Sequence, residues 1–173
     1  MKIIEYEEKY LDDVKDLLVE LEEYILDIDE DNLDQLHPEY RDKMAEIDLQ
    51  EVNENNGKCY LAIDNDKVIG LIMGIVRKYD KYDYLDYKCP KCGVVSELIV
   101  SKNARKSGIG NKLMQVMEDY FKVIGCKYIS IEVFAYNKNA IKFYEKKRLS
   151  YQMFNRYKKI IKNGDIFYGY RNI

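Results

Sequence analysis

The chain has 173 residues, 47% of them apolar, which is enough to bury the core of one domain and excludes a disordered chain. Its 28 Lys and Arg residues against 31 Asp and Glu residues leave a net charge of −3, so no overall basic field exists to bind nucleic acid. The N-terminus has no apolar run of signal-peptide length and no stretch reaches the length of a membrane span, which predicts a cytoplasmic protein with no membrane partner.

Hydrophobic periodicity predicts strands and helices in alternation along the whole chain. No repeat or linker interrupts them, so they predict one continuous α/β domain over residues 1–173, with a mixed sheet and helices on both faces. The predicted elements are, in chain order, a strand at 2–6, helices at 11–28 and 38–52, strands at 59–63, 68–76 and 94–100, a helix at 113–124, a strand at 128–134, a helix at 137–147, and tail strands at 151–160 and 166–170.

Short polar sequences mark where several of these elements begin and end. Asp64-Asn65-Asp66-Lys67 has the pattern of a hairpin turn, and Asn163-Gly164 has the same pattern in the tail. Pro38 suits the first turn of the second helix. Gly125 is a typical helix stop, and Asn137 can cap the last helix.

The segment between the strand at 94–100 and the next helix has the composition of an anion-binding loop. Gly108 and Gly110 allow a ligand to approach the backbone, and the free N–H groups at the start of the helix face the same point. A P-loop and a dinucleotide fingerprint are excluded by the glycine spacing. A strand-to-helix turn with a solvated basic rim is the structural alternative. Between Leu98 and Met117 the charged residues are all basic: Lys102, Arg105, Lys106 and Lys112.

Two ordered motifs make the chain resemble one known family. Arg105-Lys106-Ser107-Gly108-Ile109-Gly110 is similar to the [RQ]xxGx[GA] acetyl-coenzyme A loop of the GNAT superfamily of N-acetyltransferases. Asn137-Lys138-Asn139-Ala140-Ile141-Lys142-Phe143-Tyr144-Glu145-Lys146 is similar to its NxxAxxFYxK segment. The resemblance implies a GNAT-like fold with a mixed, mostly antiparallel central sheet. The chain departs from the family at Arg148-Leu149, where Gly-Phe is usual, so the exit from the last helix is expected to differ.

The resemblance implies that acetyl-CoA is the cosubstrate. Its diphosphate would lie on the N–H groups of residues 106–110, and its pantetheine arm would pair with the backbone at the end of the 94–100 strand. Asn137 would hold the arm from the other side. The residues that the resemblance predicts to bind the cofactor are Ile99, Val100, Arg105, Lys106, Ser107, Gly108, Ile109, Gly110, Asn137 and Tyr144.

Direct transfer of the acetyl group in a ternary complex requires a base and an acid. A primary amine with a pKa of about 10.4 is almost entirely protonated at pH 7, so a carboxylate must help to deprotonate it. Glu97 on the 94–100 strand is the predicted base, with Glu132 in reserve. Tyr144 is predicted to protonate the departing thiolate. The structural alternatives are a solvent-facing Glu97 and a Tyr144 ring that packs beside Phe143.

The acceptor is predicted to be a small cationic amine, such as a polyamine or an aminoglycoside-like molecule. The resemblance implies that the first helices and their connection border the acceptor, and this region is strongly acidic. A protein or peptide acceptor, a non-catalytic module that binds coenzyme A, and a solvated acidic face are alternatives. The acids of this region are Glu20, Glu22, Glu23, Asp27, Asp29, Glu30, Asp31 and Asp34.

Cys89 and Cys92 have the spacing of half a zinc site, but zinc needs four ligands. Free thiols are therefore expected and no metal is, while a zinc site completed in a homodimer and a redox disulfide are alternatives. The tyrosine-rich segment 79–87 before them is expected to extend the sheet as an exposed hairpin that could border the acceptor or a dimer contact.

Overall fold

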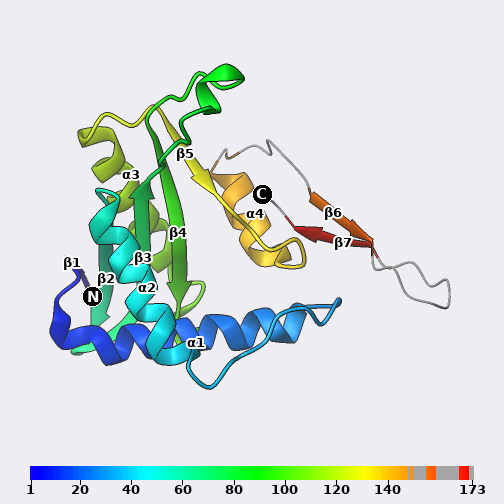
Figure 1. Ribbon diagram of the computed structural model, residues 1–173. Coiled ribbons are helices and arrows are strands. Elements are labelled where there is room, and N and C mark those ends of the chain that lie inside the picture. The colour runs from blue at the N-terminus through cyan, green and yellow to red at the C-terminus, as the bar shows by residue number, and fades with distance from the viewer. Residues whose placement is uncertain (148, 150–154, 159–167, 172–173) are drawn as a thin grey trace, which may run out of the picture. The chain divides into compact units, whose positions relative to one another are not determined.

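The computed structural model describes residues 1–147, 149, 155–158 and 168–171 (Figure 1). None of the described helices is both long enough and apolar enough to span a membrane. In chain order the helices and strands are β1 (Lys2–Glu5), α1 (Leu11–Ile28), α2 (Tyr40–Glu54), β2 (Lys58–Asp64), β3 (Lys67–Val76), β4 (Cys92–Val100), α3 (Ile109–Val123), β5 (Tyr128–Ile131), α4 (Lys138–Lys146), β6 (Asn155–Lys158) and β7 (Tyr168–Arg171).

The central sheet has the strand order β1-β2-β3-β4-β5. The first three pairings are antiparallel, and β5 alone runs parallel to its neighbour, β4. The prediction of a mixed, mostly antiparallel sheet is therefore confirmed. The β2–β3 turn is also as predicted, because Asn65 and Asp66 both have positive φ values, 47° and 59°, which a tight hairpin turn requires.

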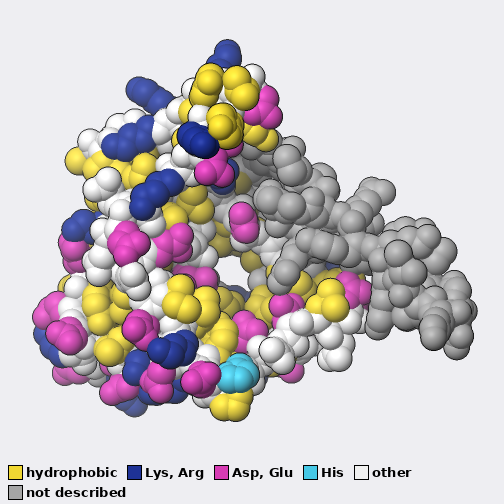
Figure 2. Space-filling view, viewed as in Figure 1, with side chains coloured by type: hydrophobic (Ala, Val, Ile, Leu, Met, Phe, Trp, Pro, Cys, Tyr) yellow, Lys and Arg dark blue, Asp and Glu magenta, His cyan; other side chains and the backbone are white. Residues whose placement is uncertain are grey.

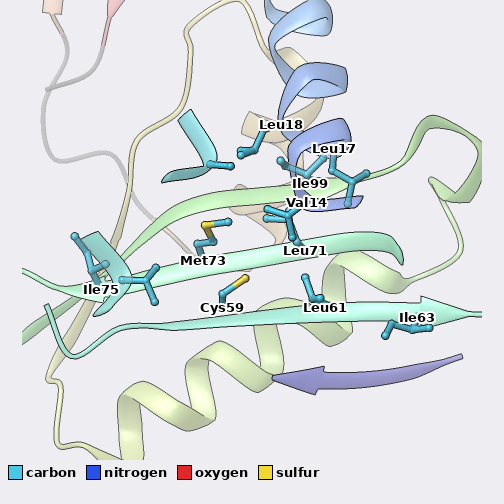
Figure 3. Close-up of a cluster of buried hydrophobic side chains, with 12 residues drawn as sticks. Val14, Leu17, Leu18, Cys59, Leu61, Ile63, Leu71, Met73, Ile75 and Ile99 are labelled. Atoms are coloured by element: carbon cyan, nitrogen blue, oxygen red, sulfur yellow. The ribbon is translucent and has the colours of Figure 1, made fainter. Parts of the chain in front are cut away.

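Helices α1 and α2 cover one face of the sheet, since both contribute to one buried cluster with its strands. Figure 3 shows Val14, Leu17 and Leu18 of α1 over the strands. Val14, Leu17 and Leu18 of α1 pack against strand residues that share one face because they alternate along the strands. The strand members of this buried cluster are Cys59, Leu61 and Ile63 of β2, Leu71, Met73 and Ile75 of β3, and Ile99 of β4.

Helix α3 covers the opposite face, where glycines in the strands make room for it. Gly74 alternates with Met73 and Ile75, so it faces away from α1 and α2. A Cβ atom at Gly74 would lie 2.7 Å from the sulfur of Met117, and one at Gly93 would lie 2.5 Å from the ring of Phe121. The side chains of α3 therefore fill the space that these two residues leave, and helices on both faces are confirmed.

Contacts divide the chain into two compact units. The first comprises residues 1–21 and 38–131 and contains the five-stranded sheet. The second comprises residues 22–37 and 132–173 and contains α4 and the antiparallel pair β6–β7. The arrangement of residues 1–173 as one domain stays a prediction.

Several predicted boundaries are corrected by the structure. Pro38 lies in a turn before α2, which begins at Tyr40, so it is not in the first helical turn. Strand β5 ends at Ile131 rather than at Phe134. The described parts of the predicted tail strands, β6 and β7, pair with each other in a two-stranded sheet, and the rest of their predicted ranges at 151–154, 159–160 and 166–167 lies outside the described residues. The predicted tail turn at 163–164 and Arg148 lie outside the described residues.

The segment 79–87 is not a hairpin, which corrects the expectation that it extends the sheet. It contains one short 3-10 turn, Asp83–Leu85, and no strand. Its apolar side chains remain largely exposed, as Figure 2 shows at the tip formed by this segment. Asp83 explains the difference, because its carboxylate accepts a hydrogen bond from the backbone N–H of Asp80 and thereby closes a local turn.

Asp48 of α2 is a buried carboxylate at the edge of the hydrophobic cluster that α1 and α2 form with the sheet. Only 7% of its surface is exposed, and among the described residues Oδ2 has no hydrogen-bond partner. Burial, with a smaller contribution from the charge of Glu51, raises the pKa of Asp48 to about 6. The negative charge is therefore costly to the folded state at neutral pH.

We expect Asp48→Asn to stabilise the fold at about pH 8 and to change little at about pH 4. The folded state binds the Asp48 proton more tightly than the unfolded chain, so stability falls as the pH rises from the ordinary Asp pKa to about 6. The amide carries no charge and avoids this loss. The gain should be about 1–2 kcal/mol after allowance for screening by water, measured by urea denaturation at both pH values.

The control variant is Glu54→Gln on the exposed side of the same helix. It removes one charge without relieving a buried group, so its stability should follow the wild type at both pH values. Equal stabilisation of Asp48→Asn at both pH values would contradict the assignment of the cost to a buried charge.

Candidate functional site

The loop between β4 and α3 brings the predicted diphosphate-binding residues together. After a 3-10 turn at Lys102–Ala104 the chain passes through Lys106, whose φ is +62°, and reaches Gly108, whose φ is +84°. Gly108 is the N-cap of α3 and its missing side chain leaves open space, with nothing within 4 Å of an added Cβ. The positive φ values turn the backbone so that α3 starts directly after the loop.

Helix α3 begins without a side-chain cap. Gly108 offers no side-chain acceptor, and the first turn contains no acidic residue. The first N–H groups of a helix have no acceptor within the helix, and they sit at the positive end of its dipole. The start of α3 therefore offers backbone donors to an anion at a point that a bulky ligand can reach.

Arg105 is fixed against the end of β4. Its Nε donates a hydrogen bond to the carbonyl oxygen of Val100 at 3.0 Å. Ser107 is held within the loop, because its hydroxyl donates to the carbonyl oxygen of Ala104. Arg105, Lys106 and Ser107 are all exposed. The loop thus presents its cations at the surface, while local hydrogen bonds set the shape of its backbone.

An acid that is remote in the sequence also contacts this loop. Glu20 of α1 accepts hydrogen bonds from the hydroxyl of Ser101, at 3.1 Å, and from the backbone N–H of Lys102. Its carboxylate also lies 3.6 Å from the guanidinium of Arg105. The sequence contains no signal for this contact, and Glu20 was grouped with the acids expected near the acceptor.

Strands β4 and β5 separate halfway along β4. They pair only from Cys92↔Tyr128 to Val95↔Ile131, while β4 continues to Val100, and Figure 1 shows the two strands diverging. The β3–β4 register shifts at the same place, because Met73 pairs with Glu97 and Gly74 pairs with Val95. Ser96 is therefore the extra residue of a β-bulge, which bends β4 where β5 leaves it.

Glu97, the predicted base, follows this bulge directly. It lies opposite Met73, so it shares the face of the sheet that α1 and α2 cover, and its side chain is half-buried. Ile99 is buried in the same cluster, and Val100 ends the strand. Glu132, the reserve candidate, follows β5 directly and is exposed.

The second unit contains the other predicted site residues. Asn137 is the N-cap of α4 as predicted, since its Oδ1 accepts a hydrogen bond from the backbone N–H of Ala140 at 3.0 Å. The hydroxyl of Tyr24 lies 3.4 Å from the same oxygen. Tyr144 lies on α4, half-buried, with its ring edge-on to Phe143 at a centroid distance of 5.2 Å. Packing against Phe143, the structural alternative for Tyr144, is therefore present.

The acidic connection after α1 contacts the segment that leads into α4. The hydroxyl of Tyr136 donates to Asp31 at 3.1 Å. Burial first, and then the hydrogen bond to Asp31 and the charges of Glu30 and Asp29, raise the pKa of Tyr136 to about 12. Asp29 itself closes the connection, because its carboxylate accepts hydrogen bonds from the backbone of residues 31, 33 and 34. A concentration of negative charge thus lies beside the residue that precedes Asn137.

A zinc site completed in a homodimer needs a second copy of the chain and stays a prediction. All the cysteines of the chain are free thiols, and burial raises the pKa of both Cys92 and Cys126. Cys89 is only half-buried, and its thiol donates to the carbonyl oxygen of Tyr87 at 3.6 Å. Within the described part of the chain, no three or more His, Cys, Asp or Glu side chains are grouped so as to hold a metal ion.

Comparison with known proteins identifies a family model and a set of related folds. The model of the acetyltransferase (GNAT) family matches residues 22–149. No curated protein sequence matches the chain. A tetramutant of the BH1408 protein from Bacillus halodurans has a similar structure, with a TM-score of 0.75 and 17% identity over 88% of this chain and 96% of that one.

Two aminoglycoside acetyltransferases also share the fold. The 6′-N-acetyltransferase AAC(6′)-IG from Acinetobacter haemolyticus matches with a TM-score of 0.62 and 18% identity over 95% of this chain and 100% of that one. AAC(6′)-Iy in complex with CoA matches with a TM-score of 0.65 and 14% identity over 92% of this chain and 100% of that one. Identities this low show a common fold only.

We expect Gly108→Ala to weaken binding of coenzyme A, the ligand that the resemblance predicts for the loop, by about tenfold or more. An alanine at φ +84° is strained and its methyl group occupies the space next to the first N–H groups of α3. Titration calorimetry with coenzyme A measures the change.

Gly125→Ala is the matched control. Gly125 also has a positive φ, +82°, and open space around it, but it follows the other end of α3. Both variants should lose similar stability, about 1–2 kcal/mol, while only Gly108→Ala loses affinity. Equal affinity in the two variants would contradict the assignment of the ligand to this loop.

Proposed function

Because the chain belongs to the acetyltransferase (GNAT) family, we propose that it acetylates a small cationic amine by direct transfer from acetyl-CoA. Family membership makes the chain an acetyl-CoA-dependent N-acetyltransferase. What we propose beyond this is the class of the acceptor and the roles of single residues.

One observation carries the donor site: the uncapped start of α3 at Gly108. Its backbone N–H groups, with the dipole behind them, suit the two negative charges of a diphosphate. Arg105 and Lys106 add positive charge at the exposed side of the loop. The chain is acidic overall, so the positive charge of this loop is a local feature and not a property of the whole surface. It therefore favours an anionic ligand at this point.

The divergence of β4 and β5 supports a pantetheine site along β4. Beyond Val95, β5 no longer pairs with β4, so we propose that an extended ligand with amide groups pairs with the edge of β4 there, next to the Val100 carbonyl oxygen that already accepts a hydrogen bond from Arg105. Asn137 is proposed to bond the arm through its side-chain amide nitrogen, since the cap to Ala140 uses its oxygen.

The proposed reaction needs no covalent enzyme intermediate. The neutral amine attacks the thioester carbonyl, a carbon–nitrogen bond forms, and the carbon–sulfur bond breaks as the tetrahedral intermediate collapses. Glu97, or Glu132 in its place, takes the proton that the amine loses, directly or through water. Tyr144 gives its phenolic proton to the thiolate of CoA and regains one from solvent.

The acidic connection supports a cationic acceptor. Asp29, Glu30 and Asp31 act together on Tyr136, one residue before Asn137, so negative potential lies next to a proposed cofactor contact. The aminoglycoside acetyltransferases that share the fold act on acceptors of this class. Glu20 is removed from the acceptor group, because its carboxylate contacts the donor loop instead.

We expect polyamines and aminoglycosides to give kcat/KM values at least about tenfold above those of neutral amines and of lysine-containing peptides. Attraction between fixed carboxylates and a polycation accounts for the preference, which should weaken as ionic strength rises. Thiol release from acetyl-CoA, followed with each amine at low and high salt, measures it. Preference for a neutral or acidic amine would contradict a cationic acceptor, and preference for the peptide would favour a protein substrate.

Tyr144→Phe should lower kcat by about 10²-fold or more and leave the affinity for CoA within about twofold, because a general acid acts only in the chemical step. Tyr136→Phe is the matched control in the same unit, since it removes a phenolic hydroxyl that bonds to Asp31. Thiol release at saturating substrate and calorimetry with CoA separate the two effects. An unchanged kcat would mean that Tyr144 only packs against Phe143 and is not the acid. CoA binding without amine-dependent turnover in the wild type would favour a non-catalytic module.

A further inference from the structure

Glu20 connects α1 to the donor loop with both of its carboxylate oxygens. Oε2 accepts the hydroxyl proton of Ser101 at 3.1 Å, and Oε1 accepts the backbone N–H of Lys102. Oε1 also lies 3.6 Å from Nη2 of Arg105. The contacts join positions that are 81 and 82 residues apart in the sequence, all within the first unit.

The other described hydrogen bonds of this loop are mostly local. Ala104 donates to Ser101, Ser107 donates to Ala104, and Arg105 donates to the carbonyl of Val100. Such bonds fix the shape of the turn but not its position against the body of the unit. The N–H of Ser101 donates to the carbonyl of Ile69 in β3, and Glu20 provides the connection on the helix side.

The fold itself does not depend on this carboxylate. Helix α1 is already anchored by Val14, Leu17 and Leu18, which are buried in the core. The Glu20 and Arg105 side chains are 30% and 37% exposed, and an ion pair with that much water around it contributes little to stability. The contacts are concentrated instead on the three residues that lead into the diphosphate-binding turn.

We propose that Glu20 is a positioning residue for the cofactor, a role that rests on the proposed function of the loop. It holds the Ser101–Arg105 segment in the conformation that the bound cofactor requires. The loop therefore loses less conformational entropy when the diphosphate binds. Glu20 itself touches neither the acetyl group nor the amine in this scheme. Its effect is confined to donor affinity.

An opposite electrostatic effect is also conceivable for an acid beside an anion site. If the charge of Glu20 acted mainly by competing with the diphosphate for Arg105, its removal would tighten cofactor binding. Two of its three contacts, however, go to an uncharged hydroxyl and to a backbone N–H. The carboxylate oxygens of Glu20 are therefore used mainly as hydrogen-bond acceptors for the loop. Positioning therefore outweighs competition.

Glu20→Ala tests the proposal. We expect the Kd for CoA and the KM for acetyl-CoA to rise about tenfold, while kcat at saturation and the KM for the amine stay within about twofold. Glu20→Gln, whose amide oxygen still accepts one of the hydrogen bonds, should recover part of the affinity. Asp16→Ala is the matched control, because it removes an acid and an ion pair to Arg41 from the same helix without touching the loop. It should leave all these constants unchanged.

Each outcome bears on one proposal only. A wild-type chain that fails to bind CoA overturns the proposed function, whereas a wild-type chain that binds with affinity equal to Glu20→Ala overturns the role of Glu20. Tighter binding by Glu20→Ala, or a fall in kcat without a change in KM for acetyl-CoA, also overturns it. Should Glu20→Ala unfold, Ser101→Ala removes one of the hydrogen bonds on the loop side, and unchanged CoA affinity in that variant contradicts the proposal.

Discussion

The backbone N–H groups at the start of a helix must find acceptors, and at α3 the chain supplies none from a capping side chain. Gly108 combines a left-handed backbone with open space, so the acceptor can be a ligand of substantial size. The neighbouring features agree with this requirement. Arg105 is fixed at the end of β4, and the first turn of α3 carries no acid that would repel an anion. The proposed donor site therefore rests on a short stretch of backbone rather than on the overall charge of this acidic protein.

A second constraint acts on the strand that leads into this loop. One residue, Ser96, is added to β4 without a partner in β3, and β5 stops pairing with β4 at the preceding residue. The bulge and the loss of pairing coincide, as expected where a bulge bends a strand and ends its pairing. Glu97 then follows the bend on the face covered by α1 and α2, which is why a carboxylate on a central strand is only half-buried.

Local signals account for what could be predicted from the sequence. The turn at Asn65-Asp66 and the cap at Asn137 each depend on a few adjacent residues, so the local sequence is sufficient to predict them, whereas α3 begins at Ile109 rather than at the predicted residue 113. The end of β5 at Ile131 was not predictable, because Val133 and Phe134 are residue types typical of strands, and only the folded chain shows that pairing with β4 ends at Ile131. The segment 79–87 failed for a related reason, since its aspartates close local turns that alternation alone does not reveal.

The contacts of Glu20, and the separate roles within the acidic run, required the folded chain. Charge counting treats the acids from Glu20 to Asp34 as one surface, yet Glu20 binds the donor loop, Asp29 closes its own connection and Asp31 binds Tyr136. A carboxylate can lie next to a proposed anion site without weakening anion binding when it already accepts hydrogen bonds from that loop. Glu20 accepts such bonds from Ser101 and Lys102. The carboxylates further along the chain act instead on the segment before Asn137, where a cationic acceptor would gain from them. Under the proposed function, one continuous acidic sequence would serve both substrates of the transfer reaction, because Glu20 contacts the loop before α3 in the first unit whereas Asp31 contacts Tyr136 in the second.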